Sequence, residues 1–285
     1  MDERQVYETA FTVDQRAATP VRGRLELVFA ANPTGTSLSH AYVSAPLKIV
    51  RPFQLAGGGL LVQVITLGPG LCAGDDCRMD ITVESGARAV VVMQAASRIL
   101  GMPGGAQATQ SVNLVVAPGG QIEYYPGLTI PFAESCFRQR VTIRADRQSR
   151  VGLLECWATG RQSRGEYLRF RHLSSRTIVT VNDQPSFADA VEIDTTSNLA
   201  AGAGILEGHR YFASGFWHGV PADAPIALPA SDALMAFGRS PAPDQMFLRA
   251  LARDGFAMSG LLQSAVDVIN AAWGCERIPM RRFVS

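Results

Sequence analysis

Two glutamates flank a glycine-bounded loop near the middle of the chain. Glu155 lies in the apolar segment 151–158, and Glu166 follows the loop that runs from Gly160 to Gly165. A carboxylate in an apolar environment is costly unless it is protonated, paired with a cation or bound to a metal ion. The surroundings of these two side chains therefore decide what chemistry this segment can support.

The direction in which Glu155 faces depends on strand register. If 151–158 and 166–173 form a hairpin, one register places Glu155 opposite Arg169, as a structural ion pair. A shift of one residue places it opposite Leu168, and both acids then share one mostly apolar face. Two carboxylates on one face can hold a divalent ion weakly. In an open cleft, roughly 5–10 Å apart, they can also act on a carbohydrate as acid and base. The pattern leaves these alternatives open.

A second candidate is the glycine-rich segment 68–76, which contains Asp75. A dinucleotide-binding loop is followed by a helix, whereas a strand pattern follows here. The segment is therefore either a wide turn or a loop that presents Asp75 to a ligand or partner. Cys72 and Cys77 lack the further soft ligands of a structural zinc site. The only lysine, Lys48, does not lie in a phosphate-binding loop, so any nucleotide hydrolysis must belong to another protein.

Composition indicates a soluble cytoplasmic protein. The 285 residues are 47% hydrophobic with a formal net charge of +1. No apolar run approaches the roughly 20 residues that span a bilayer, and the first five residues are polar rather than an apolar signal. Five scattered cysteines, an odd number, fit a reducing compartment better than a disulfide framework. No membrane association is expected.

Arginine supplies 25 of the 26 basic residues, and ten of them lie between Arg138 and Arg176. Only three acids fall in the same stretch. Lysines and interleaved aromatic side chains, which a nucleic-acid surface would favour, are missing here. The stretch is therefore either a solvated face or a protein-contact face, and no nucleic acid is expected.

The elements that position these residues are mainly strands. Residues 78–84 alternate between apolar and polar, which is typical of a half-buried strand. One apolar stripe at helical spacing covers 261–273, with Asp254 as its N-cap and Gly274 beyond its end. A short second helix is expected near 231–238, and 196–230 is expected to be loop. Further strands are expected at 24–30, 43–50, 60–67, 89–93, 111–116, 121–125, 139–144, 151–158, 166–173, 176–181 and 187–193.

This pattern predicts a mainly β fold with about two helices, one of them near the C-terminus. Many short strands with regular Gly and Pro punctuation favour a sandwich, a barrel or a β-solenoid. A strict short repeat, which an ideal parallel β-helix would show, is not visible. No domain boundary is evident, so 1–285 is expected to be a single domain with about 20 flexible N-terminal residues.

At several motifs the chain resembles the urease accessory protein UreD family, called UreH in some organisms. The resemblance extends from about Leu25 to the C-terminus, and the pattern Gly-Arg-x-x-x-Gly-Glu at 160–166 is its most specific part. The order and spacing of the motifs together carry the resemblance. They are Ala45-Pro46-Leu47-Lys48-Ile49 with Arg51-Pro52-Phe53, Gly70-Leu71-Cys72-Ala73-Gly74-Asp75, Gln94-Ala95-Ala96-Ser97-Arg98, Ile122-Glu123-Tyr124-Tyr125-Pro126 with Ile130-Pro131-Phe132, and Gly160 to Glu166.

The resemblance implies a β-rich scaffold without catalytic activity. Such a scaffold bridges apo-urease and the partners UreF and, through UreF, the GTPase UreG. The complex inserts nickel into urease, and UreD is thought to offer the ion an internal passage. We therefore assign four acids to a hypothetical transient nickel path: Glu155, Glu166, Glu123 and Asp75. Carboxylates bind a borderline divalent ion less tightly than thiolates or imidazoles, so the ion can be released.

The resemblance also implies what else the chain is expected to bind. Nickel is transferred rather than kept, and this chain itself binds no nucleotide. Whether two such heterocomplexes associate as a dimer is left open. The alternatives are the carbohydrate-active enzyme with paired carboxylates and an interaction module whose acids are all ion-paired.

Overall fold

The computed structural model describes residues 19–102, 104, 106–196, 201–202, 204–242 and 244–280. The flexibility expected for about the first 20 residues falls almost entirely outside this described part. The elements are β1 (Arg22–Asn32), β2 (Gly35–Val43), β3 (Leu47–Ile49), β4 (Phe53–Gln54), η2 (Ala56–Gly58), β5 (Leu60–Thr66), β6 (Asp76–Val83), β7 (Arg88–Gln94), β8 (Ser97–Ile99), β9 (Ala108–Val116), β10 (Gln121–Pro131), β11 (Cys136–Ala145), β12 (Arg150–Ala158), η3 (Gln162–Arg164), β13 (His172–Val181), β14 (Gln184–Asp194), β15 (Tyr211–His218), β16 (Leu234–Arg239), β17 (Gln245–Ala252) and α1 (Gly255–Ala272).

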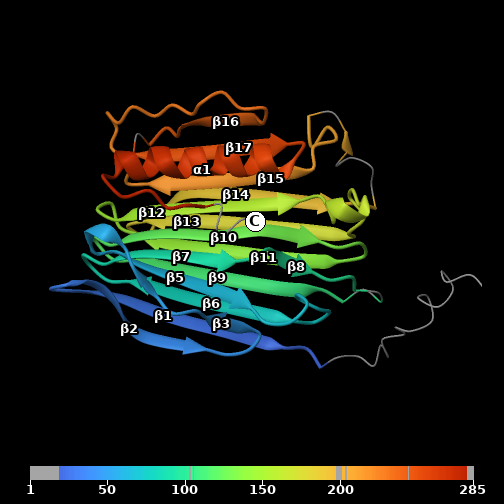
Figure 1. Cartoon of the computed structure of the whole chain (residues 1–285), viewed down its shortest axis with the longest axis horizontal. Helices are drawn as coiled ribbons and strands as arrows, with labels where there is room; N and C mark the ends of the chain where they lie inside the picture. Colours follow the sequence, from blue (N-terminus) through green and yellow to red (C-terminus); the bar gives the residue numbers. More distant parts are fainter. Residues whose placement is uncertain are drawn as a thin grey trace, which may run out of the picture.

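The strands form two sheets. Sheet A has the order β14-β13-β11-β9-β6-β1-β2, and sheet B has the order β16-β17-β15-β12-β10-β7-β5-β3, with β4 and β8 on its margins. Figure 1 shows the strands stacked from β1 and β2 at one end of the molecule to β16 and β17 at the other. The mainly β fold is therefore confirmed.

From β5 to β13 the chain winds as a solenoid, in which each coil contributes one strand to each sheet. As a result, β5, β7, β10 and β12 are parallel neighbours in sheet B, and β1, β6, β9, β11 and β13 are parallel neighbours in sheet A. The coils differ in length. Asp76 pairs with Thr109, Ala108 with Phe137 and Phe137 with Leu173, which are 33, 29 and 36 residues apart. This variation explains why the sequence shows no strict repeat.

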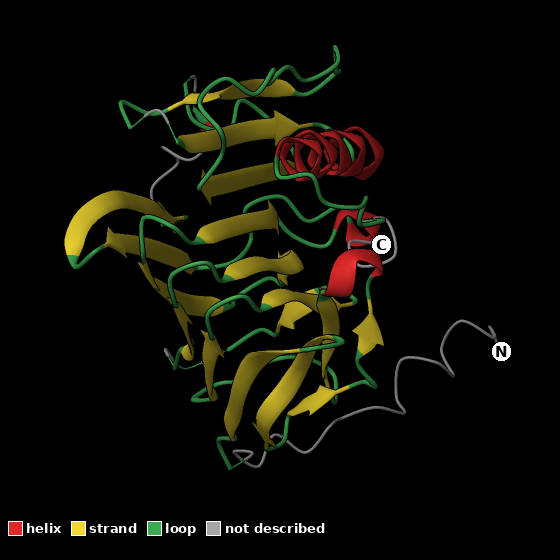
Figure 2. Cartoon of the chain, turned by 90° about the vertical axis from the view of Figure 1, so that its left-hand side faces the viewer, coloured by secondary structure: helices red, strands yellow, loops and turns green. Residues whose placement is uncertain are grey.

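Apolar side chains fill the space between the sheets and a second layer outside sheet B. The largest cluster lies between the sheets and includes Leu27, Ile81 and Val91. The second cluster packs α1 against the outer face of sheet B, and Figure 2 shows α1 along this side of the strands. Buried apolar area of this kind supplies most of the driving force for folding.

Helix α1 follows the predicted stripe. Residues Leu261, Leu262 and Ile269 are each no more than 2% exposed. The Asp254 side chain caps the helix by accepting a hydrogen bond from the Ala257 N–H at 2.8 Å. Gly274 has φ +67°, the left-handed conformation that commonly ends a helix. The helix near the C-terminus is therefore confirmed, and its stripe is core packing.

Several local expectations are wrong. The region 231–238 is not helical, because β16 occupies its second half as a half-exposed edge strand. The region 196–230 is not all loop, since it contains β15, seven of whose eight residues are buried. A strand buried on both faces carries no alternating pattern. The expected strand at 43–50 is interrupted by a turn, and 166–173 is loop until β13 begins at His172.

Candidate functional site

Glu155 lies between the two sheets, in a polar layer inside an otherwise apolar interior. Along β12, Leu153 belongs to the largest core cluster, and Trp157 belongs to a separate cluster. Glu155 lies between them and is 4% exposed. We call this layer the polar seam. It comprises Gln110 on β9, Gln139 on β11, Glu155 on β12, Ser175 and Thr177 on β13, Asp189 on β14, Ser214 on β15 and Arg249 on β17.

Neutral side chains donate the hydrogen bonds that the carboxylate of Glu155 accepts. The Gln139 amide donates hydrogen bonds to Glu155 and, at 3.1 Å, to the Ser175 hydroxyl. The Thr177 hydroxyl donates to Glu155 at 3.4 Å, and Gln110 donates to the Gln139 carbonyl at 3.1 Å. Hydrogen bonds of this kind offset part of the cost of burying a carboxylate, but none supplies a positive charge.

The protonation of Glu155 follows from this environment. Burial raises the pKa of Glu155 to about 7, and the nearby Asp189 carboxylate adds to the rise. The hydrogen bonds from Gln139 and Thr177 and the charge of Arg249 oppose it. A carboxyl group with this pKa can change between its acid and its anionic form near neutral pH.

The polar seam reaches solvent on the side of Asp189 and Arg249. Asp189 accepts a hydrogen bond from the Ser214 hydroxyl at 2.7 Å and forms an ion pair with Arg249. The Arg249 side chain is 44% exposed, whereas that of Asp189 is 12% exposed. Arg249 also lines a groove of about 680 Å³ whose other walls are mainly apolar, from β14, β16 and β17. The seam therefore connects the interior with this groove.

Glu166 has a different environment, in the loop between β12 and β13. Its carboxylate accepts hydrogen bonds from the Arg161 Nε at 3.0 Å and the Arg161 backbone N–H at 3.2 Å, and it forms an ion pair with the same guanidinium. The Arg161 guanidinium also lies over the Phe132 ring, 4.3 Å from its centroid. These contacts lower the pKa of Glu166, chiefly through the hydrogen bond from Arg161.

This loop explains the motif Gly-Arg-x-x-x-Gly-Glu in physical terms. Gly160 has φ +141°, and a Cβ there would lie 3.0 Å from the Glu166 Cβ. Gly165 has φ +68° and ends the short helix η3. The two glycines allow the loop to close, and the Arg161–Glu166 pair holds it closed. Each conspicuous residue of the motif therefore has a structural role.

Asp75 also stabilises the conformation of a loop, the glycine-rich segment 68–76. Its two carboxylate oxygens accept hydrogen bonds from the Val21 N–H at 2.8 Å and the Cys72 N–H at 2.7 Å. The side chain is 6% exposed. Gly70 of the same loop packs so closely on Arg98 that a Cβ would lie 2.4 Å from the Arg98 carbonyl oxygen. The second and third motifs of the chain thus meet here.

Glu123 lies on the outer face of sheet B, beneath α1. It is fully buried and accepts hydrogen bonds from the Tyr125 hydroxyl at 2.9 Å and the Gln121 amide at 3.3 Å. The Arg88 guanidinium lies 3.4 Å from it and also pairs with Glu276. Burial raises the pKa of Glu123, while Arg88 and Tyr125 oppose the rise.

The structure therefore distributes the four predicted acids over four environments. The predicted hairpin is wrong in both registers, because β12 pairs with β10 and β15, and Glu155 lies opposite Gly127 and Ser214. Glu155 and Glu166 do not share a face. The paired-carboxylate enzyme needs both acids in one cleft, and this arrangement does not provide it.

The residues that sequence reasoning missed are the partners of Glu155. Gln139 is the one polar residue on the inward face of β11, whose other inward residues are apolar. This exception to the alternating pattern is the signal that could have identified it. Asp189 and Arg249 come from strands far along the chain, and only the fold brings them to Glu155. Among the described residues, no group of three or more His, Cys, Asp or Glu side chains is arranged to hold a metal ion.

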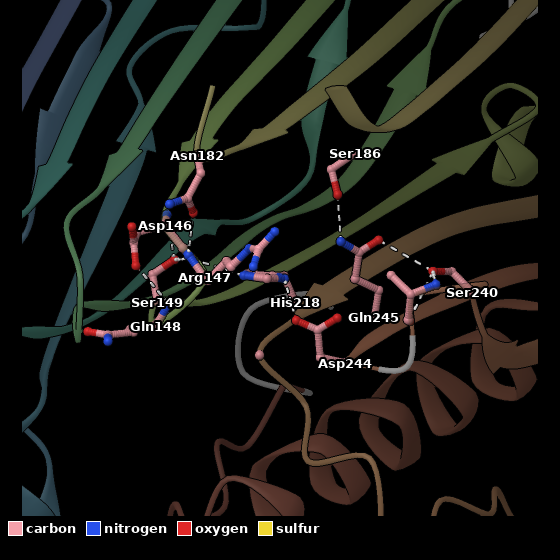
Figure 3. A network of polar contacts seen from close by, with 12 residues as sticks. Asp146, Arg147, Gln148, Ser149, Asn182, Ser186, His218, Ser240, Asp244 and Gln245 are labelled. Carbon is pink, nitrogen blue, oxygen red and sulfur yellow. Dashed lines mark hydrogen bonds and ion pairs between the residues drawn. The ribbon is translucent and has the colours of Figure 1, made fainter. Parts of the chain in front are cut away.

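A second polar network closes the interior at the other end of β15 (Figure 3). The His218 Nε2 donates to the Asp146 carbonyl oxygen at 3.0 Å, and its Nδ1 lies 3.3 Å from the Asp244 carboxylate. His218 is 1% exposed. Phe216, stacked on Phe187 with ring centroids 4.5 Å apart, separates this network from the polar seam. His218 thus ties the β11–β12 turn to the loop before β17.

None of the helices within the described residues combines the length and the apolar composition needed to cross a bilayer. All five cysteines are free thiols.

Comparison with known proteins agrees with the motifs. The family described as UreD urease accessory protein matches residues 21–283. The chain is 36% identical over 195 residues to the urease accessory protein UreD 1 of Synechococcus sp. (strain JA-3-3Ab), which covers 68% of this chain and 73% of that protein. It is 35% identical over 210 residues to the urease accessory protein UreD of Deinococcus radiodurans, covering 74% of each. It is 26% identical over 269 residues to that of Actinomyces naeslundii, covering 92% of this chain and 98% of that protein. These matches, together with the motifs that form the loops at Asp75 and Glu166, show that the chain belongs to the UreD urease accessory protein family.

Proposed function

We propose that this chain is the scaffold of a cytoplasmic, GTP-dependent complex that inserts nickel into apo-urease. In this proposal UreF binds the chain, UreG joins through UreF, and UreG hydrolyses the nucleotide. Membership of the family supports a role in urease maturation. The free state of all five cysteines fits a reducing compartment.

The polar seam is the observation that carries the nickel part of the proposal. It places carboxylate, amide and hydroxyl oxygens in a layer that leads from the buried Glu155 to the groove at Arg249. Oxygen ligands hold a borderline divalent ion weakly enough to release it. A cation that displaces the proton of Glu155 would supply the positive charge that the direct contacts of this carboxylate do not provide. We propose the seam as part of an internal passage for nickel.

The four predicted acids are not equal in this proposal. Both carboxylate oxygens of Asp75 already accept backbone hydrogen bonds, and Glu166 is held by Arg161. Glu123 has Arg88 beside it. Within the described part of the chain, Glu155 alone among the four is contacted neither by a cation nor by backbone N–H donors, so we rank it first as a nickel ligand.

The proposed role can be tested by expressing apo-urease and its accessory proteins with and without this chain. The nickel content of the purified urease is the measurement. Nickel should be present when the chain is expressed and nearly absent when it is omitted. Equal nickel content in both cases would defeat the proposed role.

A second experiment tests the path itself. The quadruple variant E155Q/E166Q/E123Q/D75N removes the four charges. If it still binds its partners and remains folded, urease should receive much less nickel. Unchanged activation by a folded, complexed quadruple variant would exclude these acids from the path.

A further inference from the structure

Four arginines form a basic patch on the outer face of sheet A. Arg138, Arg140 and Arg144 alternate along β11, and Arg176 lies on β13 directly beside Arg140. All four side chains are exposed, while the residues between them point into the interior. Like charges at neighbouring positions on one face repel each other. We call this set the basic patch.

Two arginines at the other end of the same face have acidic partners. Arg24 pairs with Glu26 at 2.5 Å, and Arg78 pairs with Asp80 at 2.7 Å. By contrast, within the part of the chain that the structure describes, no residue of the basic patch has an ion pair or a side-chain hydrogen bond. Among the described residues, Arg24 and Arg78 on this face of sheet A are therefore paired, whereas the four arginines of the basic patch are not.

The basic patch also surrounds a hollow of about 380 Å³. Arg138, Arg140 and Arg176 line it, and the small side chains of Ala188 and Ala190 on β14 leave room between them. Asp189 also lines the hollow, but its carboxylate pairs with Arg249. Glu192 lies at the rim but is directed to His172, with 3.3 Å between their polar atoms. The hollow is therefore rimmed by guanidinium groups, whose planar donor arrangement matches carboxylates.

We propose that the basic patch docks an acidic surface of a protein partner, whose Asp or Glu side chains enter the hollow. Charge complementarity is the argument: three guanidinium groups line one hollow and repel each other. Among the described residues none of the three forms an ion pair, since the two acids that line the same hollow, Asp189 and Glu192, contact Arg249 and His172 instead. The choice of candidate partners rests on the proposed function, but the chemistry of the surface does not.

A polynucleotide is the less favoured occupant. The outward positions of β11 and β13 are Cys136, Arg138, Arg140, Thr142, Arg144, His172, Ser174, Arg176, Ile178 and Thr180, and none is Phe, Tyr or Trp. Surfaces that bind single strands use aromatic rings as stacking platforms beside their basic residues.

The test uses two matched double variants of the full chain. R140Q/R176Q removes two unpaired arginines, and R24Q/R78Q removes two paired arginines from the same face. Purified apo-urease and a purified UreF–UreG complex serve as separate binding partners, titrated in nuclease-treated samples at several salt concentrations. R140Q/R176Q should bind at least one of them about tenfold more weakly, with a reduced salt dependence, because guanidinium–carboxylate contacts are lost. R24Q/R78Q should bind like the wild type.

The outcomes separate the inference from the proposed function. If the wild type binds neither partner, the proposed function fails. If the wild type binds and R140Q/R176Q binds equally well, or loses no more than R24Q/R78Q, the docking surface is wrong. Gel-shift and sedimentation measurements compare nucleic-acid binding and self-association of the same proteins, and the docking surface is also wrong if R140Q/R176Q loses only one of these. Circular dichroism and thermal melting check that both variants remain folded.

Discussion

Asp189 and Glu155 approach the same polar seam from opposite sheets, and of these two only Asp189 has a described cation in direct contact. Its carboxylate pairs with Arg249, whereas Glu155 accepts hydrogen bonds from Gln139 and Thr177. Two carboxylates in one layer, with a single cation that contacts the less buried Asp189, favour protonation of the buried Glu155. Burial and the charge of Asp189 accordingly raise the pKa of Glu155 to about 7.

The first prediction concerns stability against pH. The folded-state pKa of Glu155 lies above its ordinary value of 4.5, so the folded protein binds more protons between pH 4.5 and 7. The free energy of unfolding should therefore fall by up to about 3 kcal/mol as the pH rises through this window, and then level off. E155Q should lack this fall. Urea unfolding of both proteins from pH 4.5 to 8 measures the difference, and parallel pH profiles would refute the raised pKa.

The Arg161–Glu166 ion pair should have the opposite effect on the pH dependence of stability. Arg161 lowers the pKa of Glu166 through its hydrogen bonds, so the pair stabilises the fold above the ordinary carboxyl pKa and is lost as the pH falls through the lowered value. E166Q should lower the free energy of unfolding by about 1–2 kcal/mol at pH 7, after allowance for partial exposure of Arg161.

The same cost should shrink as the pH falls through the lowered pKa of Glu166, because the wild-type carboxyl group is then protonated as well. R164Q changes an exposed arginine of the same loop and should alter stability by less than about 0.5 kcal/mol. An E166Q effect that persists unchanged at low pH would mean that the ion pair is not its cause.

Much of this architecture could be predicted from the sequence, because alternating strands such as β6 and the stripe of α1 carry their own periodicity. The surroundings of Glu155 could not be predicted. Strand β12 is buried on both faces, so its sequence does not reveal which side faces the interior. Asp189 and Arg249 reach Glu155 only through solenoid winding, and coils of unequal length hide that winding in the sequence.

The glycines of the Gly-Arg-x-x-x-Gly-Glu loop offer a graded test of local geometry. Gly165 has φ +68°, and a Cβ added there would have no described neighbour within 4 Å, so G165A should cost about 1 kcal/mol. Gly160 has φ +141°, and a Cβ there would meet Glu166 at 3.0 Å, so G160A should cost roughly 3 kcal/mol. Thermal or urea unfolding distinguishes them, and equal costs would contradict this loop conformation.

The most direct measurement is the nickel content of urease matured with E155Q. Partner binding by the variant is checked by co-purification, and E84Q, which removes an exposed acid, is the matched control. If Glu155 carries nickel through the polar seam, E155Q should deliver about tenfold less nickel per urease active site, while E155D retains part of the delivery and E84Q all of it. Wild-type nickel content in urease matured by a folded, complexed E155Q variant would contradict the account.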